Sequence, residues 1–128
     1  MAAEQTREIM EAYWAGDLSR LADDAVFTVM GTDEEAQGRE AIGQMLRAYY
    51  DTAFDADTVT RNMVFTDEHA LLEADFSGRH VGDFRGIPAS GKEISVPLCV
   101  SYDLAGGFVT RARIYFETDA LRRQIGMA

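Results

Sequence analysis

The chain has 128 residues, of which 47% are hydrophobic and 27% charged, and its 22 acidic and 12 basic residues give a net charge of −10. This length favours one domain, which we expect to span residues 1–128. The negative charge disfavours nucleic acid and anionic membrane surfaces as partners, because both reward clustered Lys and Arg. A single cysteine and two histidines exclude a disulfide framework and a multi-cysteine or His-rich metal site. The N-terminus lacks the cationic start of a signal peptide and no apolar run suits a membrane helix, so we expect a cytoplasmic protein.

The first half of the chain predicts helices and one strand. Apolar residues at helical spacing predict an amphipathic helix over residues 4–15 and another over 38–51. Between them, residues 18–22 favour a short helix and residues 25–30 a short buried strand. Residues 31–37 form an acidic loop in this prediction.

From residue 58 onward the pattern becomes that of strands. We predict strands over 58–65, 69–84, 93–104 and 108–116, separated by turn residues, and a closing helical turn over 119–125. Short connections between consecutive strands imply antiparallel neighbours. Helices followed by a strand meander predict an α+β fold, in which N-terminal helices pack on a curved, mainly antiparallel sheet and enclose a pocket.

Four segments resemble a known family. The segment SGRHVGDFRGIPASGK (residues 77–92) resembles the H-x-G-x-F-x-G-[IM]-P-x-[ST]-G-[KR] hairpin of SnoaL-like polyketide cyclases, in the NTF2-like superfamily. RIYFETDALRRQIG (113–126) is similar to that family's last strand and terminal turn. AGDLSRLADDAVF (15–27) and GREAIGQML (38–46) are similar to the superfamily's helix-to-strand passage and third helix. The resemblance implies a cone-shaped sheet around a largely apolar pocket, no cofactor, and a homodimer.

The resemblance also indicates which catalytic groups are missing. Counting back from Gln124, the general acid/base Asp of SnoaL-like cyclases corresponds to Ile114, which cannot transfer a proton. Both carboxylates of the similar limonene epoxide hydrolases are absent at the matching positions, and so are the polar groups of ketosteroid isomerases. An epoxide or ester hydrolase therefore ranks below the other interpretations.

His80 and Asp103 are the candidate catalytic residues. His80 matches a family position that often lines the pocket, and strand alternation places it on the same face as Phe76. Its structural alternative is a hydrogen-bonded histidine that holds the hairpin. Asp103 shares a strand face with Cys99. If that face points into the cone, Asp103 or Cys99 supplies the missing acid or base, and if it points outward it is the polar face of a half-buried sheet.

We expect the substrate to contact side chains on the predicted helices and strands. These candidate substrate-binding residues are Trp14, Thr28, Met30, Tyr49, Phe76, Cys99, Ile114 and Phe116. The favoured function is cofactor-independent acid/base cyclisation or isomerisation of a neutral, largely apolar, polyketide- or terpenoid-like molecule, with His80 as acid/base. The alternative is a non-catalytic ligand-binding or dimerisation protein that kept the scaffold and lost the acids.

Overall fold

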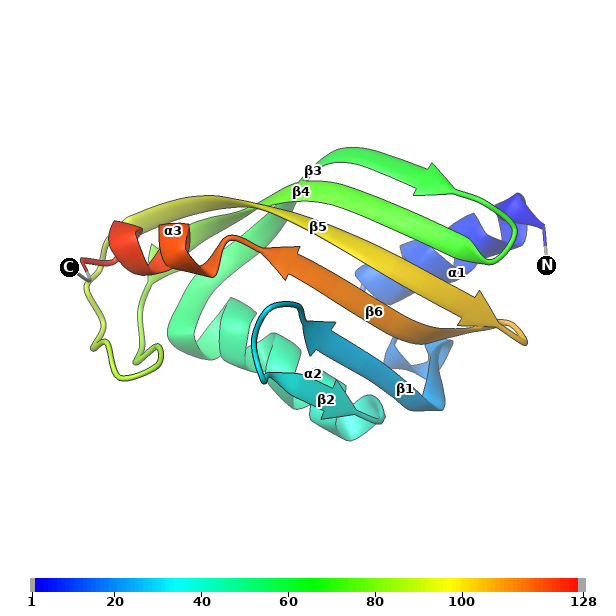
Figure 1. Ribbon diagram of the computed structural model, residues 1–128, viewed down its shortest axis with the longest axis horizontal. Helices are drawn as coiled ribbons and strands as arrows, with labels where there is room; N and C mark the ends of the chain where they lie inside the picture. Colours follow the sequence, from blue (N-terminus) through cyan, green and yellow to red (C-terminus); the bar gives the residue numbers. More distant parts are fainter. Residues whose placement is uncertain (1, 127–128) are drawn as a thin grey trace.

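The computed structural model describes residues 2–126, which form three α-helices and a six-stranded sheet (Figure 1). The ends of the predicted domain, residue 1 and residues 127–128, lie outside the described residues. The helices are α1 (Ala3–Trp14), α2 (Arg39–Arg47) and α3 (Thr118–Gln124), together with the 3₁₀ turn η1 (Leu18–Arg20) and the π-helical η2 (Ala48–Ala53). The strands are β1 (Leu21–Val29), β2 (Glu35–Gln37), β3 (Phe54–Phe65), β4 (His69–His80), β5 (Glu93–Ala105) and β6 (Phe108–Phe116).

The sheet is open and mixed, with the strand order β2-β1-β6-β5-β4-β3. Strands β3 to β6 form an antiparallel meander, as predicted, and β1 pairs with β2 antiparallel and with β6 parallel. The α+β prediction with helices on a mainly antiparallel sheet is therefore confirmed. The parallel pairing brings the N-terminal half of the chain beside the last strand.

Several predicted boundaries were wrong, because strand pairing overrides local preference. Strand β1 begins at Leu21, which pairs with Val109, where the end of a short helix was expected. Strand β3 begins at Phe54, which pairs with His80, rather than at residue 58. The predicted acidic loop contains β2, and the predicted helix over 38–51 continues as a π-helix after residue 47.

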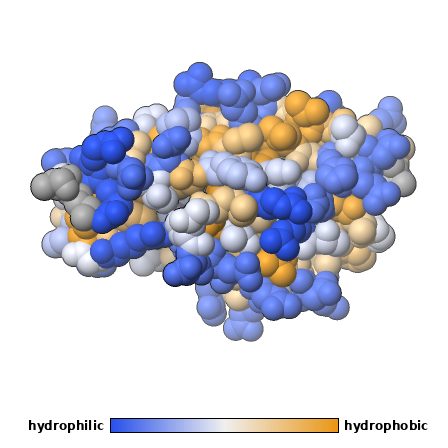
Figure 2. All heavy atoms as spheres, viewed as in Figure 1, coloured by the Kyte–Doolittle hydropathy of each residue, from blue (hydrophilic) through white to orange (hydrophobic). Residues whose placement is uncertain are grey.

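The two faces of the sheet differ in polarity, as the alternation of residues predicts. On β5, Leu98 and Tyr102 are buried on the concave face, whereas Cys99 and Asp103 lie half-buried on the outer face. The polar face of β5 thus points away from the helices, which is the second of the two alternatives weighed above. Figure 2 shows the outer side of the sheet, where hydrophilic residues alternate with hydrophobic ones.

Helix α1 packs across the concave face through residues spaced three and four apart. Its buried residues are Thr6, Ile9, Met10 and Tyr13. The Tyr13 ring makes edge contacts with Phe27, at a centroid distance of 5.9 Å, and with Tyr102, at 6.1 Å. Within residues 2–126, no helix is long and apolar enough to cross a membrane.

Close pairing of β3 and β4 depends on Gly78. A Cβ atom at this position would overlap the carbonyl oxygen of Asp55 and lie 2.5 Å from the Cα of Ala56. We expect Gly78→Ala to lower the free energy of unfolding by about 1 to 3 kcal/mol, since the strands must separate to admit the methyl group. Urea denaturation measures the change. The neighbouring Ser77→Ala is the control, and an equal effect of both substitutions would contradict the close approach.

Candidate functional site

A cavity of about 550 Å³ lies between the concave face of the sheet and the segments α1, α2 and η2. Its volume is in the range of small-molecule sites in proteins. Eight aromatic residues line it, namely Tyr13, Trp14, Phe27, Tyr49, Tyr50, Phe76, Tyr102 and Phe116. Most of the other lining residues are aliphatic: Leu18, Val29, Met45, Leu46, Ala56, Leu72, Leu98, Val100 and Ile114. A mostly apolar molecule therefore fits this space.

Three buried tyrosines, Tyr13, Tyr50 and Tyr102, contribute phenol groups to the cavity wall. The Tyr13 side chain is only 7% exposed, and its hydroxyl has no hydrogen-bond partner among the described residues. The Tyr102 hydroxyl accepts a hydrogen bond of 3.3 Å from the Trp14 indole nitrogen. The Tyr50 hydroxyl lies 2.6 Å from the Thr58 hydroxyl. Within residues 2–126, the side-chain atoms that are both fully buried and without a hydrogen-bond partner are His80 Nε2 and Arg111 Nε. The Tyr13 hydroxyl is not among them, so it is not sealed within protein and opens on the cavity.

Burial keeps these phenols protonated. It raises the pKa of Tyr13 well above its ordinary value, and the pKa values of Tyr50 and Tyr102 rise for the same reason. The phenols are also close enough to influence one another, since Tyr102 and Tyr50 each add to the rise at Tyr13. A neutral phenol donates a hydrogen bond to a ligand oxygen, and a lower local dielectric strengthens that bond.

A second polar cluster is centred on Tyr49, which also lines the cavity. The Tyr49 hydroxyl donates a 2.6 Å hydrogen bond to Glu34 Oε1, and Arg85 binds the same carboxylate oxygen at 2.8 Å. Burial, followed by the Glu34 hydrogen bond, raises the pKa of Tyr49 to about 12. Arg85 has a φ of 49°, a backbone conformation that is rare for residues other than glycine. These contacts tie the loop before β2 to the loop after β4 beside the cavity.

The family model of the SnoaL-like polyketide cyclases matches residues 1–125. The chain belongs to this family. No curated protein sequence matches the chain.

Solved structures show the same fold across almost the whole chain. A protein from Jannaschia sp. CCS1 assigned to the SnoaL-like polyketide cyclases is 19% identical with a TM-score of 0.86, covering 99% of this chain and 95% of that one. TsrD from Streptomyces laurentii is 25% identical with a TM-score of 0.79 and 98% coverage of both chains. A Catenulispora acidiphila protein with a ketosteroid isomerase-like fold, solved with trimethylamine, is 19% identical with a TM-score of 0.74 and 94% coverage of both. Two of the three are under 25% identical, and that likeness shows the fold alone.

The structure brings part of the predicted substrate-binding set to the cavity of this SnoaL-like protein. The predicted residues that line the cavity are Trp14, Tyr49, Phe76, Ile114 and Phe116. Ile114 lines it at the position where the family resemblance leads us to expect an aspartate.

The other predicted substrate-binding residues, Thr28, Met30 and Cys99, are absent from the lining. Thr28 donates a hydrogen bond to Glu35 on the outer face. Burial raises the pKa of the Cys99 thiol, which lies on the outer face of β5. Side chains alternate between the two faces along a strand, and this explains why Thr28 and Cys99 both point outward.

His80 is fully buried but does not line the cavity. It sits at the end of β4, where its ring packs at 5.2 Å from Phe54. The backbone N–H of Ser90 donates to His80 Nδ1 at 3.1 Å, and the Ser90 hydroxyl lies 2.9 Å from the same atom. Because an amide N–H can only donate, Nδ1 is the acceptor and the ring proton is on Nε2. The geometry corresponds to the structural alternative, in which His80 holds the hairpin closed.

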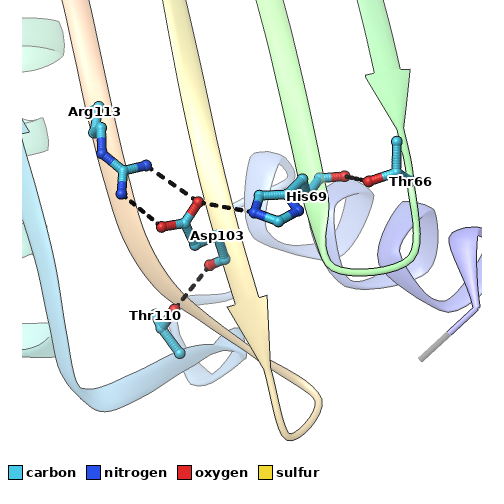
Figure 3. Close-up of polar contacts among 5 residues, drawn as sticks. All are labelled: Thr66, His69, Asp103, Thr110 and Arg113. Carbon is cyan, nitrogen blue, oxygen red and sulfur yellow. Dashed lines mark hydrogen bonds and ion pairs between the residues drawn. The ribbon is translucent and has the colours of Figure 1, made fainter.

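Asp103 lies on the outer face, away from the cavity (Figure 3). Its carboxylate accepts two hydrogen bonds from Arg113, of 3.1 and 2.8 Å, and lies 3.5 Å from His69 Nε2. The Arg113 hydrogen bonds lower the pKa of Asp103 below its ordinary 3.8. The arrangement ties β4, β5 and β6 together across the sheet, so the described contacts of Asp103 are those of a structural ion pair.

Sequence reasoning did not select the three phenols as site residues. Tyr13 and Tyr50 lie on the apolar stripes of the predicted helices, and Tyr102 lies on the apolar face of its strand. Such positions are usually core. The available signal was chemical: a buried phenol needs a hydrogen-bond partner, and three of them converging on one face favour a polar site.

We expect His80→Ala to destabilise the protein by about 2 to 4 kcal/mol, because it removes the acceptor of the Ser90 amide and leaves a void beside Phe54. Ligand binding in the cavity should persist wherever the variant is folded. Thermal unfolding and ligand titration measure the two effects separately. Loss of binding or turnover with unchanged stability would instead give His80 a place in the reaction.

The Asp103–Arg113 pair should make stability depend on acid pH. Because the folded pKa of Asp103 is lowered, its stabilisation is complete above the ordinary 3.8 and is lost as pH falls through the lowered value. Asp103→Asn should therefore cost about 1 kcal/mol at neutral pH, with a difference from the wild type that disappears in strong acid. The exposed Asp55→Asn is the control. A loss of ligand binding in Asp103→Asn would contradict its place outside the site.

Proposed function

We propose that this SnoaL-like protein is an enzyme that cyclises or isomerises a small molecule with a largely apolar, polyketide- or terpenoid-like skeleton, without a cofactor. One observation carries the proposal: Tyr13 is only 7% exposed, its ring makes an edge contact with Tyr102, and its hydroxyl has no described partner at the wall of an apolar cavity. A hydroxyl that opens on a cavity and has no protein partner is free to donate a hydrogen bond to an oxygen of the molecule in that cavity. A carbonyl or hydroxyl oxygen of the substrate supplies that partner.

The two phenols act by polarising the bound oxygen. Ring closure and double-bond shifts next to a carbonyl begin when solvent water takes an α-proton, and the electrons of the broken C–H bond then develop negative charge on the carbonyl oxygen. Tyr13 donates one hydrogen bond to that oxygen, and Tyr102 donates the second. Trp14 orients Tyr102, because the indole N–H already occupies a lone pair of the Tyr102 hydroxyl. In this proposal the phenols replace His80 and Asp103 as the groups that act on the substrate.

The alternative function is a non-catalytic binding protein. It is favoured by Ile114, an apolar residue that lines the cavity at the position where the family's cyclases carry their acid/base aspartate. Such a protein would use the same phenols to hold an oxygen without driving a reaction.

We also propose that the protein acts in the cytoplasm as a homodimer. The outer face of the sheet supports the homodimer, since it carries large exposed apolar side chains. These include Leu71, 40% exposed, and Tyr115, 50% exposed. A second copy of the chain packed on this face would remove these apolar side chains from water.

Two bicyclic probes test the proposed oxygen site, 1-decalone and decalin, which differ chiefly in one carbonyl oxygen. Trp14 is the only tryptophan and lines the cavity, so its fluorescence reports binding. We expect decalone to bind more tightly than decalin. Tyr13→Phe should weaken decalone binding about three- to tenfold, in line with the loss of one hydrogen bond, and leave decalin unaffected. The exposed Tyr115→Phe is the matched control.

The same probe separates the enzyme from the binding protein. An enzyme that polarises the carbonyl should accelerate exchange of the α-hydrogens of decalone in D₂O, as measured by NMR. Tyr13→Phe should slow that exchange. Decalone that binds without faster exchange would support the binding protein, and equal affinity of wild type and Tyr13→Phe would remove Tyr13 from the site.

A further inference from the structure

The charged groups at the cavity wall all have the same sign. Asp51, in η2, and Asp57, in β3, are the only charged residues among the described residues that line the cavity. Both are exposed, and neither has an ion-pair partner within residues 2–126. The Asp57 carboxylate is close enough to the Tyr50 hydroxyl to contribute to its raised pKa. A cationic group on a ligand pairs with these carboxylates, whereas an anionic group is repelled.

The rest of the wall suits an organic cation rather than a metal ion. Aromatic ring faces carry negative potential and attract ammonium groups, most strongly when water is excluded. Eight aromatic residues surround the space that opens toward the two aspartates. In the part of the chain that the structure describes, no group of three or more His, Cys, Asp or Glu residues is placed to hold a metal.

The Tyr13 hydroxyl, which the proposed function assigns to a substrate oxygen, lies in the same cavity as the two aspartates. The Tyr13 hydroxyl has no partner among the described residues, although its side chain is more than nine-tenths buried. A hydrocarbon in the cavity would leave that hydroxyl unsatisfied. The wall thus offers a hydrogen bond at Tyr13 and negative charge at Asp51 and Asp57.

We infer that the substrate is an organic cation, in which an apolar skeleton carries a protonated or quaternary amine beside Asp51 and Asp57 and an oxygen at Tyr13. This inference rests on the proposed function, because it assigns the charge of the molecule that the same cavity binds. It replaces the neutral substrate expected from the sequence. The apolar walls alone suit a neutral molecule, whereas Asp51 and Asp57 at the wall favour a cation.

Two isosteric probes test the charge directly. Benzyltrimethylammonium and neopentylbenzene have the same shape. They differ in the central atom, which is a positively charged nitrogen in the first and a neutral carbon in the second. Titration against Trp14 fluorescence gives both dissociation constants. We expect the cation to bind about tenfold more tightly than its neutral isostere, through the aspartates and the ring faces.

Matched variants locate the charge effect. Asp57→Asn should weaken binding of the cation about fivefold and change binding of neopentylbenzene less than twofold at about 150 mM salt, where distant charges are screened. Asp55→Asn removes the same charge two residues earlier on β3, outside the cavity lining, and should change neither affinity by as much as twofold. Equal effects of the two substitutions would overturn the assignment of the amine to the cavity wall.

The outcomes separate this inference from the proposed function. If neopentylbenzene binds as tightly as the cation while decalone binds in a Tyr13-dependent way, the cationic substrate is wrong and the oxygen site stands. If neither isostere nor decalone alters Trp14 fluorescence up to about 1 mM, the limit of weak specific binding, both proposals are overturned.

Discussion

Edge-to-face contacts between α1 and the concave face of the sheet fix both the core and the cavity. The Tyr13 ring meets Phe27 and Tyr102, and the Trp14 ring packs at 6.0 Å from Tyr102. These rings are buried by their apolar parts, so their polar ends lie where the packed core gives way to open space. The interactions that hold the first helix on the sheet therefore also decide where the cavity offers hydrogen bonds.

The opposite wall is built by the same principle. The Tyr49 ring packs against Phe76 and Phe116 while its hydroxyl is held by Glu34 and Arg85. Beyond this wall, Phe54 and the loop after β4 cover His80. Aromatic packing at both ends leaves a space whose sides are apolar and whose charged groups are confined to Asp51 and Asp57 among the described residues.

The sequence was sufficient to predict the layers of the fold and the faces of its strands, because side-chain alternation is a local property. It put His80 on the same face as Phe76, and it put Asp103 with Cys99 on the opposite face of their strand from Tyr102, leaving open which of those two faces points into the cone. Alternation gives the face but not the position along the strand, so it could not show that His80 lies beyond the cavity and beneath a hairpin. The grouping of the phenols of Tyr13, Tyr50 and Tyr102 depends on contacts between α1, η2 and β5, which are remote in sequence. A periodic pattern in the sequence does not indicate which distant side chains meet at one site.

In the proposed site, Tyr13 and Tyr102 together bind the oxygen of a small molecule. A crystal structure of the protein with 1-decalone bound tests it most directly. We expect the decalone oxygen within about 3.2 Å of both phenol oxygens, the usual limit for a hydrogen bond, with the hydrocarbon rings against Phe76 and Phe116. A bound decalone whose oxygen points away from Tyr13, or that lies outside the cavity, would contradict it.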